Sequence, residues 1–182
     1  MDSITMKLRD EIEPDFETAE KRYPEVLKLI LDYTDWCDEH GDEDFSEYKE
    51  LEDRLHMITG KEMSRFSLGE WWEGDGAEHL AFNISLPDPQ VVEDITKDEL
   101  AEIVRRMKTF EIPDPVDRSF KGMFYNYICF GSNYFPDFLK LNFKDYHINL
   151  FQSHQDKDGN YYEYSQEKIT DTLWNGGLNS KK

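Results

Sequence analysis

Residues 32–53 restrict the fold more than any other part of the sequence. They carry 11 acidic side chains and a single basic one, Lys49. Burying an unpaired charge costs several kcal/mol or more, so this run must expose carboxylates to water along its whole length. Its apolar residues must therefore gather on the opposite face, as they do in an amphipathic element.

Apolar residues in this region recur every three or four positions, which predicts two amphipathic helices. The first is expected over residues 24–40, because Pro24 suits a first helical turn and Gly41 a helix end. The second is expected over residues 46–58, ended by Gly60. The expected buried faces hold Val26, Leu27, Ile30, Tyr33, Thr34 and Cys37, with Trp36 at the edge, and then Phe45, Tyr48, Leu51, Leu55 and Ile58.

Three further segments flank these helices or follow them. Short helical pieces are expected over residues 16–22 and 67–73. Thr96 and Glu99 form a capping-box pattern, which predicts a helix to about Lys108. The two prolines of residues 111–115 predict a stiff connector.

Elsewhere apolar and polar residues alternate, which is typical of half-buried strands. Alternation covers residues 80–86, 139–143 and 146–150. Asp158-Gly159 precedes the tyrosine-rich residues 161–164 and is a strong β-hairpin signal. The sequence therefore predicts an antiparallel meander within residues 136–168.

Together these elements predict an α+β fold, with acidic N-terminal helices packed on an antiparallel β-meander in the C-terminal half. Residues 1–182 are expected to form a single domain. Residues 1–75 would be its acidic helical part, and residues 76–182 an α+β part with aromatic-rich antiparallel strands. Aromatic side chains make up 14% of the sequence, which is enough to build a core despite the charge.

The net charge of −19 is confined to one part of the chain. Residues 1–115 hold 32 acidic and 13 basic side chains, whereas residues 116–182 hold eight of each. A surface this acidic repels phosphates and anionic lipid, so we expect no direct DNA binding by the acidic half and no membrane association. The expected partner is a basic protein.

Other features bear on the compartment. No apolar run approaches the roughly 18 residues that cross a bilayer. The N-terminus has no signal-peptide pattern, and Cys37 and Cys129 are isolated thiols. These features predict a cytoplasmic protein with reduced cysteines.

Residues 156–167 partly match a calcium-binding EF-hand loop. Asp156, Asp158, Asn160 and Glu167 occupy ligand positions 1, 3, 5 and 12. Tyr161 stands where the sharp turn requires glycine. A β-hairpin turn is the preferred interpretation, and we expect no metal or cofactor.

The remaining candidates for chemistry are two histidines. His147 and His154 could act as a general acid–base pair of the ribonuclease type. An ordinary surface or core role is the competing interpretation. The sequence shows no metal-binding histidine motif, no phosphate-binding glycine loop and no hydrolase nucleophile motif.

In size, acidity and lack of catalytic motifs, the chain resembles the small acidic inhibitors carried by phages and mobile elements, such as anti-CRISPR and anti-restriction proteins. It also resembles the acidic immunity proteins that block nuclease toxins. This resemblance implies a nuclease, such as Cas9, or its nucleic-acid complex as the target. The implied action is to occupy a basic nucleic-acid groove.

Helical rows of carboxylates can substitute for phosphates in such a groove, which nominates a set of partner-binding residues. Adjacent tryptophans are added because tryptophan is enriched in binding hot spots. The set is Asp32, Asp35, Glu39, Asp42, Glu43, Asp44, Glu47, Glu50, Asp53, Trp71 and Trp72. Two alternatives stay open: an enzyme such as a metal-independent ribonuclease that uses His147 and His154, or a plain acidic adaptor protein.

Overall fold

The computed structural model describes residues 6–110, 116–129 and 133–179. This part of the chain is mostly helical, with seven α-helices and a single two-stranded sheet. The predicted α+β fold is therefore wrong, because no antiparallel meander occurs in the described C-terminal half. The predicted connector, residues 111–115, lies outside the described residues.

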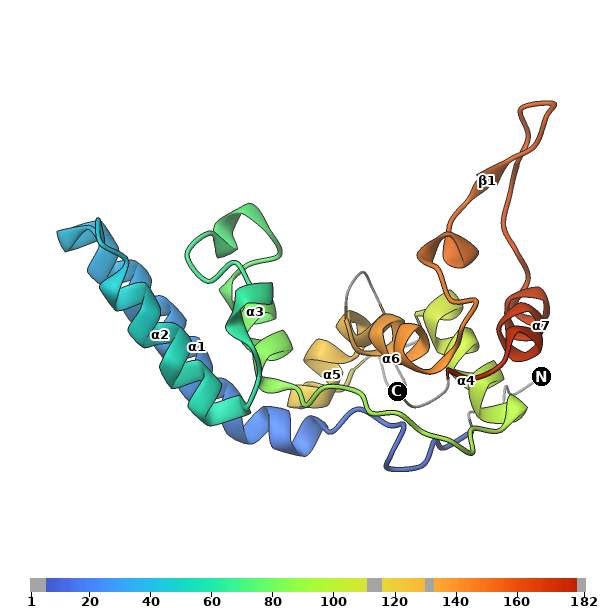
Figure 1. The fold of residues 1–182 in the computed structure, drawn as a ribbon, viewed down its shortest axis with the longest axis horizontal. Helices are drawn as coiled ribbons and strands as arrows, with labels where there is room; N and C mark the ends of the chain where they lie inside the picture. The colour runs from blue at the N-terminus through green and yellow to red at the C-terminus, as the bar shows by residue number, and fades with distance from the viewer. Residues whose placement is uncertain (1–5, 111–115, 130–132, 180–182) are drawn as a thin grey trace. The chain divides into compact units, whose positions relative to one another are not determined.

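The chain divides into two compact units. One is Asp15–Pro87, which contains 20 acidic and 7 basic residues, a net charge of −13; we call it the acidic unit. The other combines Met1–Pro14 with Asp88–Lys182, with 20 acidic and 14 basic residues, a net charge of −6; we call it the mixed-charge unit. Figure 1 shows the elements of both units.

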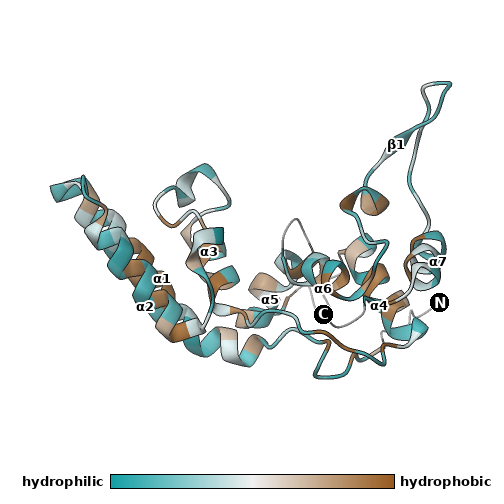
Figure 2. Cartoon of the chain, in the orientation of Figure 1, coloured by the Kyte–Doolittle hydropathy of each residue, from teal (hydrophilic) through white to brown (hydrophobic). Residues whose placement is uncertain are grey.

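The acidic unit consists of helices packed on a long first helix. In chain order these are α1 (Phe16–His40), α2 (Ser46–Thr59), the 3-10 turns η1 (Met63–Arg65) and η2 (Trp71–Glu73), and α3 (Ala77–Ser85). α1 contacts both α2 and α3, and Figure 1 shows α1 and α2 lying side by side. Figure 2 shows hydrophilic and hydrophobic residues interspersed along both helices, as expected of amphipathic elements. The buried cluster between the elements is Val26, Leu29, Ile30, Leu51, Leu55, Met63, Leu68, Ala77, Ala81 and Ile84.

α1 joins the two helical segments that were expected on either side of Pro24. Asp15 caps it by accepting a hydrogen bond from the Thr18 amide at 2.9 Å. Pro24 lies inside the helix, where it removes one hydrogen bond to the carbonyl of Glu20. Because Pro24 is exposed, water can replace that bond, and the helix continues through it.

The second predicted helix is confirmed. α2 ends at Gly60, whose φ of 73° lies in the left-handed region that glycine tolerates. Leu51 and Leu55 are buried one turn apart, as predicted. Phe45 differs from the prediction: it precedes the helix with a φ of 57°, and its side chain is 68% exposed.

The strand predicted over residues 80–86 is wrong, because Ala77–Ser85 is helix α3. Its buried residues are Ala77, Ala81, Phe82, Ile84 and Ser85, and the recurrence every four positions at 77, 81 and 85 is that of a helix face. Ala81 and Ser85, assigned to an exposed face by the alternation, are fully buried. Small side chains at these positions let α3 lie close against α1.

The mixed-charge unit is also built from helices. Its elements are α4 (Lys97–Thr109), α5 (Phe120–Phe124), η3 (Tyr125–Cys129), α6 (Tyr134–Asn142), η4 (Ile148–Phe151), β1 (His154–Gln155), β2 (Tyr161–Tyr162) and α7 (Gln166–Gly176). The predicted capping box is confirmed: Thr96 Oγ1 accepts from the Glu99 amide at 3.2 Å, and the Glu99 carboxylate accepts from the Thr96 amide at 2.8 Å. α4 packs against α7.

The strands predicted over residues 139–150 are likewise wrong. Residues 134–142 form α6, whose buried positions Phe135, Phe138, Leu139 and Asn142 follow helical spacing. Asn142 can be buried because its side-chain amide is satisfied by hydrogen bonds. Its Oδ1 accepts from the Val92 amide at 2.8 Å, and its Nδ2 donates to the Gln90 carbonyl at 3.1 Å. The polar residue that completed the apparent alternation therefore belongs to the core.

The β-hairpin predicted at Asp158-Gly159 is present but short. His154 pairs with Tyr162, and Gln155 with Tyr161. Gly159 has a φ of 87°, which explains the glycine in the turn. The residues after the hairpin form α7 rather than a further strand, and the Ser165 side chain caps that helix.

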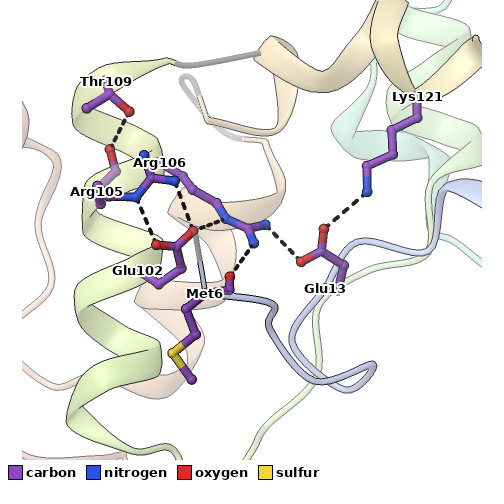
Figure 3. Close-up of polar contacts among 7 residues, drawn as sticks. All are labelled: Met6, Glu13, Glu102, Arg105, Arg106, Thr109 and Lys121. Carbon is purple, nitrogen blue, oxygen red and sulfur yellow. Dashed lines mark hydrogen bonds and ion pairs between the residues drawn. The ribbon is translucent and has the colours of Figure 1, made fainter. Parts of the chain in front are cut away.

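A network of charges around the buried Arg106 and Glu102 fastens the N-terminal segment to α4 (Figure 3). Arg106 donates to Glu102 at 2.9 Å, to Glu13 at 2.8 Å and to the Met6 carbonyl at 3.3 Å. Burial opposes the charge on Arg106, but Glu102 and Glu13 hold its pKa above the usual value. Burial also acts to raise the pKa of Glu102, and hydrogen bonds from Arg105 and Arg106 outweigh it, so that pKa is lowered.

Among the described residues, no helix is both long and apolar enough to span a membrane.

Candidate functional site

The carboxylates of α1 form an exposed row. Asp32, Asp35 and Glu39 follow one another at spacings of three and four, so they project from one face of the helix. Asp32 forms an ion pair with Lys28 one turn earlier. Asp35 and Glu39 form no ion pair or side-chain hydrogen bond with any described residue. This end of the row is available to an external cation.

The carboxylates of α2 are less uniform. Glu47 is half-buried and Glu50 is exposed, and neither forms an ion pair with a described residue. Asp53 pairs with Lys49 at 3.0 Å, one helical turn away. An exposed pair of this kind is weak and screened by salt, so a partner can displace it.

α1 and α2 enclose a groove of about 180 Å³, which we call the interhelix groove. Its rim carries Asp32 from α1 and Glu47 and Glu50 from α2. Tyr33 and Trp36 supply aromatic walls, and Arg54 lies on the α2 side. Burial is the main factor that raises the pKa of Tyr33, with the Cys37 thiol and Asp42 adding to it, so Tyr33 keeps its proton at neutral pH. The groove therefore combines three carboxylates with aromatic surface.

Two of the nominated acids in the connecting loop act as caps of α2. The Asp42 carboxylate accepts hydrogen bonds from the Tyr48 amide at 2.9 Å and the Glu47 amide at 3.3 Å. Asp44 accepts from the Ser46 amide at 3.1 Å, and hydrogen bonds from Ser46 lower the pKa of Asp44. Glu43 is exposed. Their position next to a helix N-terminus also suits negative charge.

The two nominated tryptophans differ in environment. Trp71 is half-buried against the core cluster, and its indole Nε1 donates to Thr34 Oγ1 at 2.9 Å. Trp72 is 57% exposed and meets Trp71 edge to face, with ring centroids 5.7 Å apart. Trp71 is therefore fixed in place by α1, whereas Trp72 can contact a partner.

Trp71 also lines a second cavity of about 290 Å³, beside η2 and the start of α3. Its other lining residues include Glu70, Glu73, Asp75 and His79. Sequence reasoning did not identify this cavity, because the fold brings Thr34 and Trp71 together across 37 positions.

The residues of the calcium-like loop serve the β-hairpin. Asp156 accepts from the amides of Asp158 at 2.9 Å and Asn160 at 2.8 Å, and from the Asn160 side chain at 3.1 Å. These hydrogen bonds lower the pKa of Asp156, the backbone bond from Asn160 contributing most. Glu167 lies in the first turn of α7. Within residues 6–110, 116–129 and 133–179, no three acidic, histidine or cysteine side chains gather closely enough to hold a metal ion.

The two candidate catalytic histidines are held in different ways. A ring nitrogen of His154 lies 2.9 Å from the Asn149 carbonyl, and its ring packs against Tyr162 and Tyr164 at centroid distances of 5.3 and 4.6 Å. His147 is exposed just before η4. No hydrogen bond joins the two imidazoles in the described part of the chain.

Cys129, one of the two isolated thiols, is buried. Burial raises the pKa of its thiol to about 12, so it stays protonated and unreactive at neutral pH. Cys37 is partly buried on α1.

Comparison with family models, curated proteins and solved structures gives no significant match to this chain.

Proposed function

We propose that this chain is a protein-binding inhibitor of a nucleic-acid-handling enzyme, acting through the α1–α2 face of the acidic unit. The target is a nuclease or its nucleic-acid complex, whose basic groove the carboxylates occupy in place of phosphates. The segregation of charge carries this proposal. A net charge of −13 lies in the 73 residues of Asp15–Pro87, and Asp35, Glu39, Glu47 and Glu50 form no ion pair with a described residue.

Plain solubility explains the segregation less well. A surface that only needs to stay soluble can interleave both signs, whereas like charges one helical turn apart repel by about 0.2–0.5 kcal/mol per pair. The row Asp32, Asp35, Glu39 has spacings of this kind, so the chain tolerates repulsion there. A basic partner surface would relieve that repulsion on binding.

The carboxylate positions also suit a groove built for a nucleic-acid strand. Along α1 the row advances by about 4.5 Å and then about 6 Å, at 1.5 Å per residue. From α2, Glu47 and Glu50 line the interhelix groove together with Asp32 of that row. Carboxylates from two rigid helices can therefore engage several Lys or Arg side chains at once.

Reversing the row tests the proposal. The variant carries Asp32→Lys, Asp35→Lys and Glu39→Lys, all at exposed positions, so the fold should survive. A matched control carries Asp10→Lys, Glu11→Lys and Asp158→Lys, which change the net charge equally at exposed sites in the mixed-charge unit. Circular dichroism must first show that both variants retain their helices.

Binding is measured against Cas9, with and without guide RNA, and against a colicin-type nuclease domain. We expect the wild type and the control to inhibit at least one of these, and the row variant to lose at least 100-fold in affinity. Association should slow as salt rises from 10 to 150 mM, because the Debye length shortens from about 30 Å to about 8 Å. If the row variant inhibits as well as wild type, the carboxylate row is not the binding surface. If no panel member binds the wild type, this target class is wrong.

A further inference from the structure

We infer that the cavity beside Trp71 is a receptor for one arginine side chain of the partner protein. This inference rests on the proposed function, since it names a group that the basic partner would insert. We call the cavity the Trp71 pocket; the residues that carry the inference are Glu70, Trp71, Glu73 and Asp75.

The size of the pocket limits the occupant. Its volume of about 290 Å³ lies just below the range of about 300–1,000 Å³ that is typical of small-molecule sites. A single long side chain fits this volume better than a nucleotide or a cofactor. A protein partner supplies such a side chain naturally.

The charge of the lining favours a cation. Glu70, Glu73 and Asp75 are exposed at the pocket and form no ion pair or side-chain hydrogen bond with another described residue. Among the described residues, no lysine or arginine lines the pocket, and His79 is the only basic group there. The three carboxylates therefore have hydrogen-bond acceptors free for an incoming donor.

The aromatic wall favours a cation with a flat face. Trp71 is held by its hydrogen bond to Thr34 Oγ1, which in turn donates to the Ile30 carbonyl at 3.0 Å. A fixed indole offers a ready surface for cation–π stacking, and tryptophan is the best aromatic partner for this. Trp72 meets Trp71 edge to face but is not among the residues that line the pocket, so the aromatic wall is Trp71.

The spread of the carboxylates separates arginine from a metal ion. Glu70, Glu73, Asp75 and His79 all lie within the described residues, yet they do not gather closely enough to hold a metal. A metal ion needs ligands that converge on one point, within about 2.0–2.6 Å. A guanidinium instead presents five donors around a plane, so it can reach acceptors that lie apart while it stacks on an indole. The lysine ammonium is a compact charge without a flat face, so it gains less binding energy from stacking on the Trp71 indole.

The test uses a probe that does not depend on the partner. Capped arginine, N-acetyl-L-arginine methylamide, is titrated to 50 mM into the full-length chain labelled with ¹⁵N, and the Trp71 indole N–H signal is followed by NMR. Weak exposed ion pairs and one cation–π contact correspond to a Kd on the order of 10 mM. We expect a saturable shift of the Trp71 signal, and capped lysine should bind at least threefold more weakly.

Variants then locate the binding. Glu73→Gln with Asp75→Asn removes two charges from the pocket while keeping the side-chain shapes, and should weaken capped-arginine binding at least fivefold. The control, Glu20→Gln with Glu25→Gln, removes two exposed charges of α1 outside the pocket lining and should leave binding within twofold. Wild-type spectra elsewhere in each variant show that the fold is intact.

The outcomes separate this inference from the proposed function. No shift of Trp71 up to 50 mM, equal binding of lysine, or equal binding by the Glu73/Asp75 variant overturns the arginine pocket. Tight binding of Ca²⁺ or Mg²⁺ at the same residues also overturns it, in favour of a metal site. None of these results bears on the α1 row, because the row variant is tested against nucleases. Conversely, capped arginine can bind even if every nuclease in the panel fails.

Discussion

Replacement of Arg106 by methionine should destabilise the mixed-charge unit strongly. Arg106 side-chain nitrogens lie 2.9 Å from Glu102, 2.8 Å from Glu13 and 3.3 Å from the Met6 carbonyl, and the side chain is 7% exposed. Removing one partner of a buried ion pair typically costs about 3–5 kcal/mol, because the other charge stays buried without compensation. Methionine fills much of the space, so the loss comes from the charges rather than from a cavity.

The structure places the expected loss at the lower end of that range. Glu102 keeps Arg105, whose Nε and Nη2 lie 2.8 and 3.0 Å from its carboxylate oxygens. Glu13 keeps Lys121 at 3.4 Å. Both carboxylates therefore retain one cation, and we expect a loss of about 3 kcal/mol.

Native-state hydrogen exchange measures this loss for each unit separately. A loss of about 3 kcal/mol corresponds to roughly 100-fold faster exchange of the most protected amides of α4 and α6. Amides of α1 and α2, in the other unit, serve as the internal reference. Lys28→Met, which breaks an exposed pair with Asp32, should change exchange little.

A second variant keeps the reasoning testable if Arg106→Met does not fold. Arg106→Lys retains the charge but loses the planar guanidinium, so it should fall between wild type and methionine. Acceleration of less than fivefold for Arg106→Met would refute the reasoning. It would mean that the ion pairs only offset the cost of burying their charges.

Two further predictions concern single carboxylates. The pKa of Glu102 is lowered from its ordinary value of 4.5. Its contribution to the free energy of unfolding is therefore complete above that value and is lost as the pH falls through the lower folded pKa. Urea denaturation at pH 6 and pH 3 should show this loss, and Glu102→Gln should reduce the difference in stability between the two pH values. Asp42→Ala removes a carboxylate that accepts hydrogen bonds from two amides in the first turn of α2. It should cost about 1 kcal/mol, seen as faster exchange at Tyr48 and Leu51, whereas Glu43→Ala should have little effect.

The long acidic helices could be predicted from the sequence because the charge pattern and the apolar periodicity both indicate amphipathic helices. The carboxylates of α1 and α2 must face water, so the apolar residues between them can only pack as helical stripes. Gly60 and the Thr96–Glu99 capping box are local signals, and both act as expected. Pro24 misled the prediction because proline is compatible with an exposed helix interior when tertiary packing stabilises the rest.

The shorter helices could not be predicted, because their polar positions are buried by contacts that are distant in sequence. In α3 the fully buried Ser85 completes a helical face that looks like the polar half of a strand. In α6 the same holds for Asn142, whose amide is satisfied by Gln90 and Val92, about 50 positions earlier. Without knowledge of these distant contacts, a short apolar run fits the period of a helix and the period of a strand equally well.

In the candidate site, too, the features set by local pattern were predictable and those set by contacts distant in sequence were not. The exposure of Asp35, Glu39 and Glu50 follows from local periodicity and was predictable. The capping role of Asp42 depends on the loop geometry before α2, and the Trp71 pocket depends on Thr34 meeting Trp71 across 37 residues. Local patterns therefore identified which charges are exposed but not which of them border a cavity.

Salt should stabilise the acidic unit more than the mixed-charge unit. With a net charge of −13 in 73 residues, the acidic unit is opposed by its own repulsion, and raising the ionic strength from 0.01 to 1 M shortens the Debye length from about 30 Å to about 3 Å. The mixed-charge unit instead contains pairs such as Lys97–Asp171 and Lys108–Glu163, both at 2.6 Å, which salt weakens. Hydrogen exchange in NaCl should therefore slow in α1 and α2 and change little, or accelerate, in α4 and α7.

The charge-reversed row gives the decisive comparison for this salt effect. Asp32→Lys, Asp35→Lys and Glu39→Lys reduce the net charge of the acidic unit from −13 to −7, so its stabilisation by salt should fall to well under that of wild type. An equal salt response in both proteins would mean that the row is not under repulsive strain. In that case a basic partner would relieve nothing by binding there, and the energetic reason for placing the binding surface on α1 would be lost.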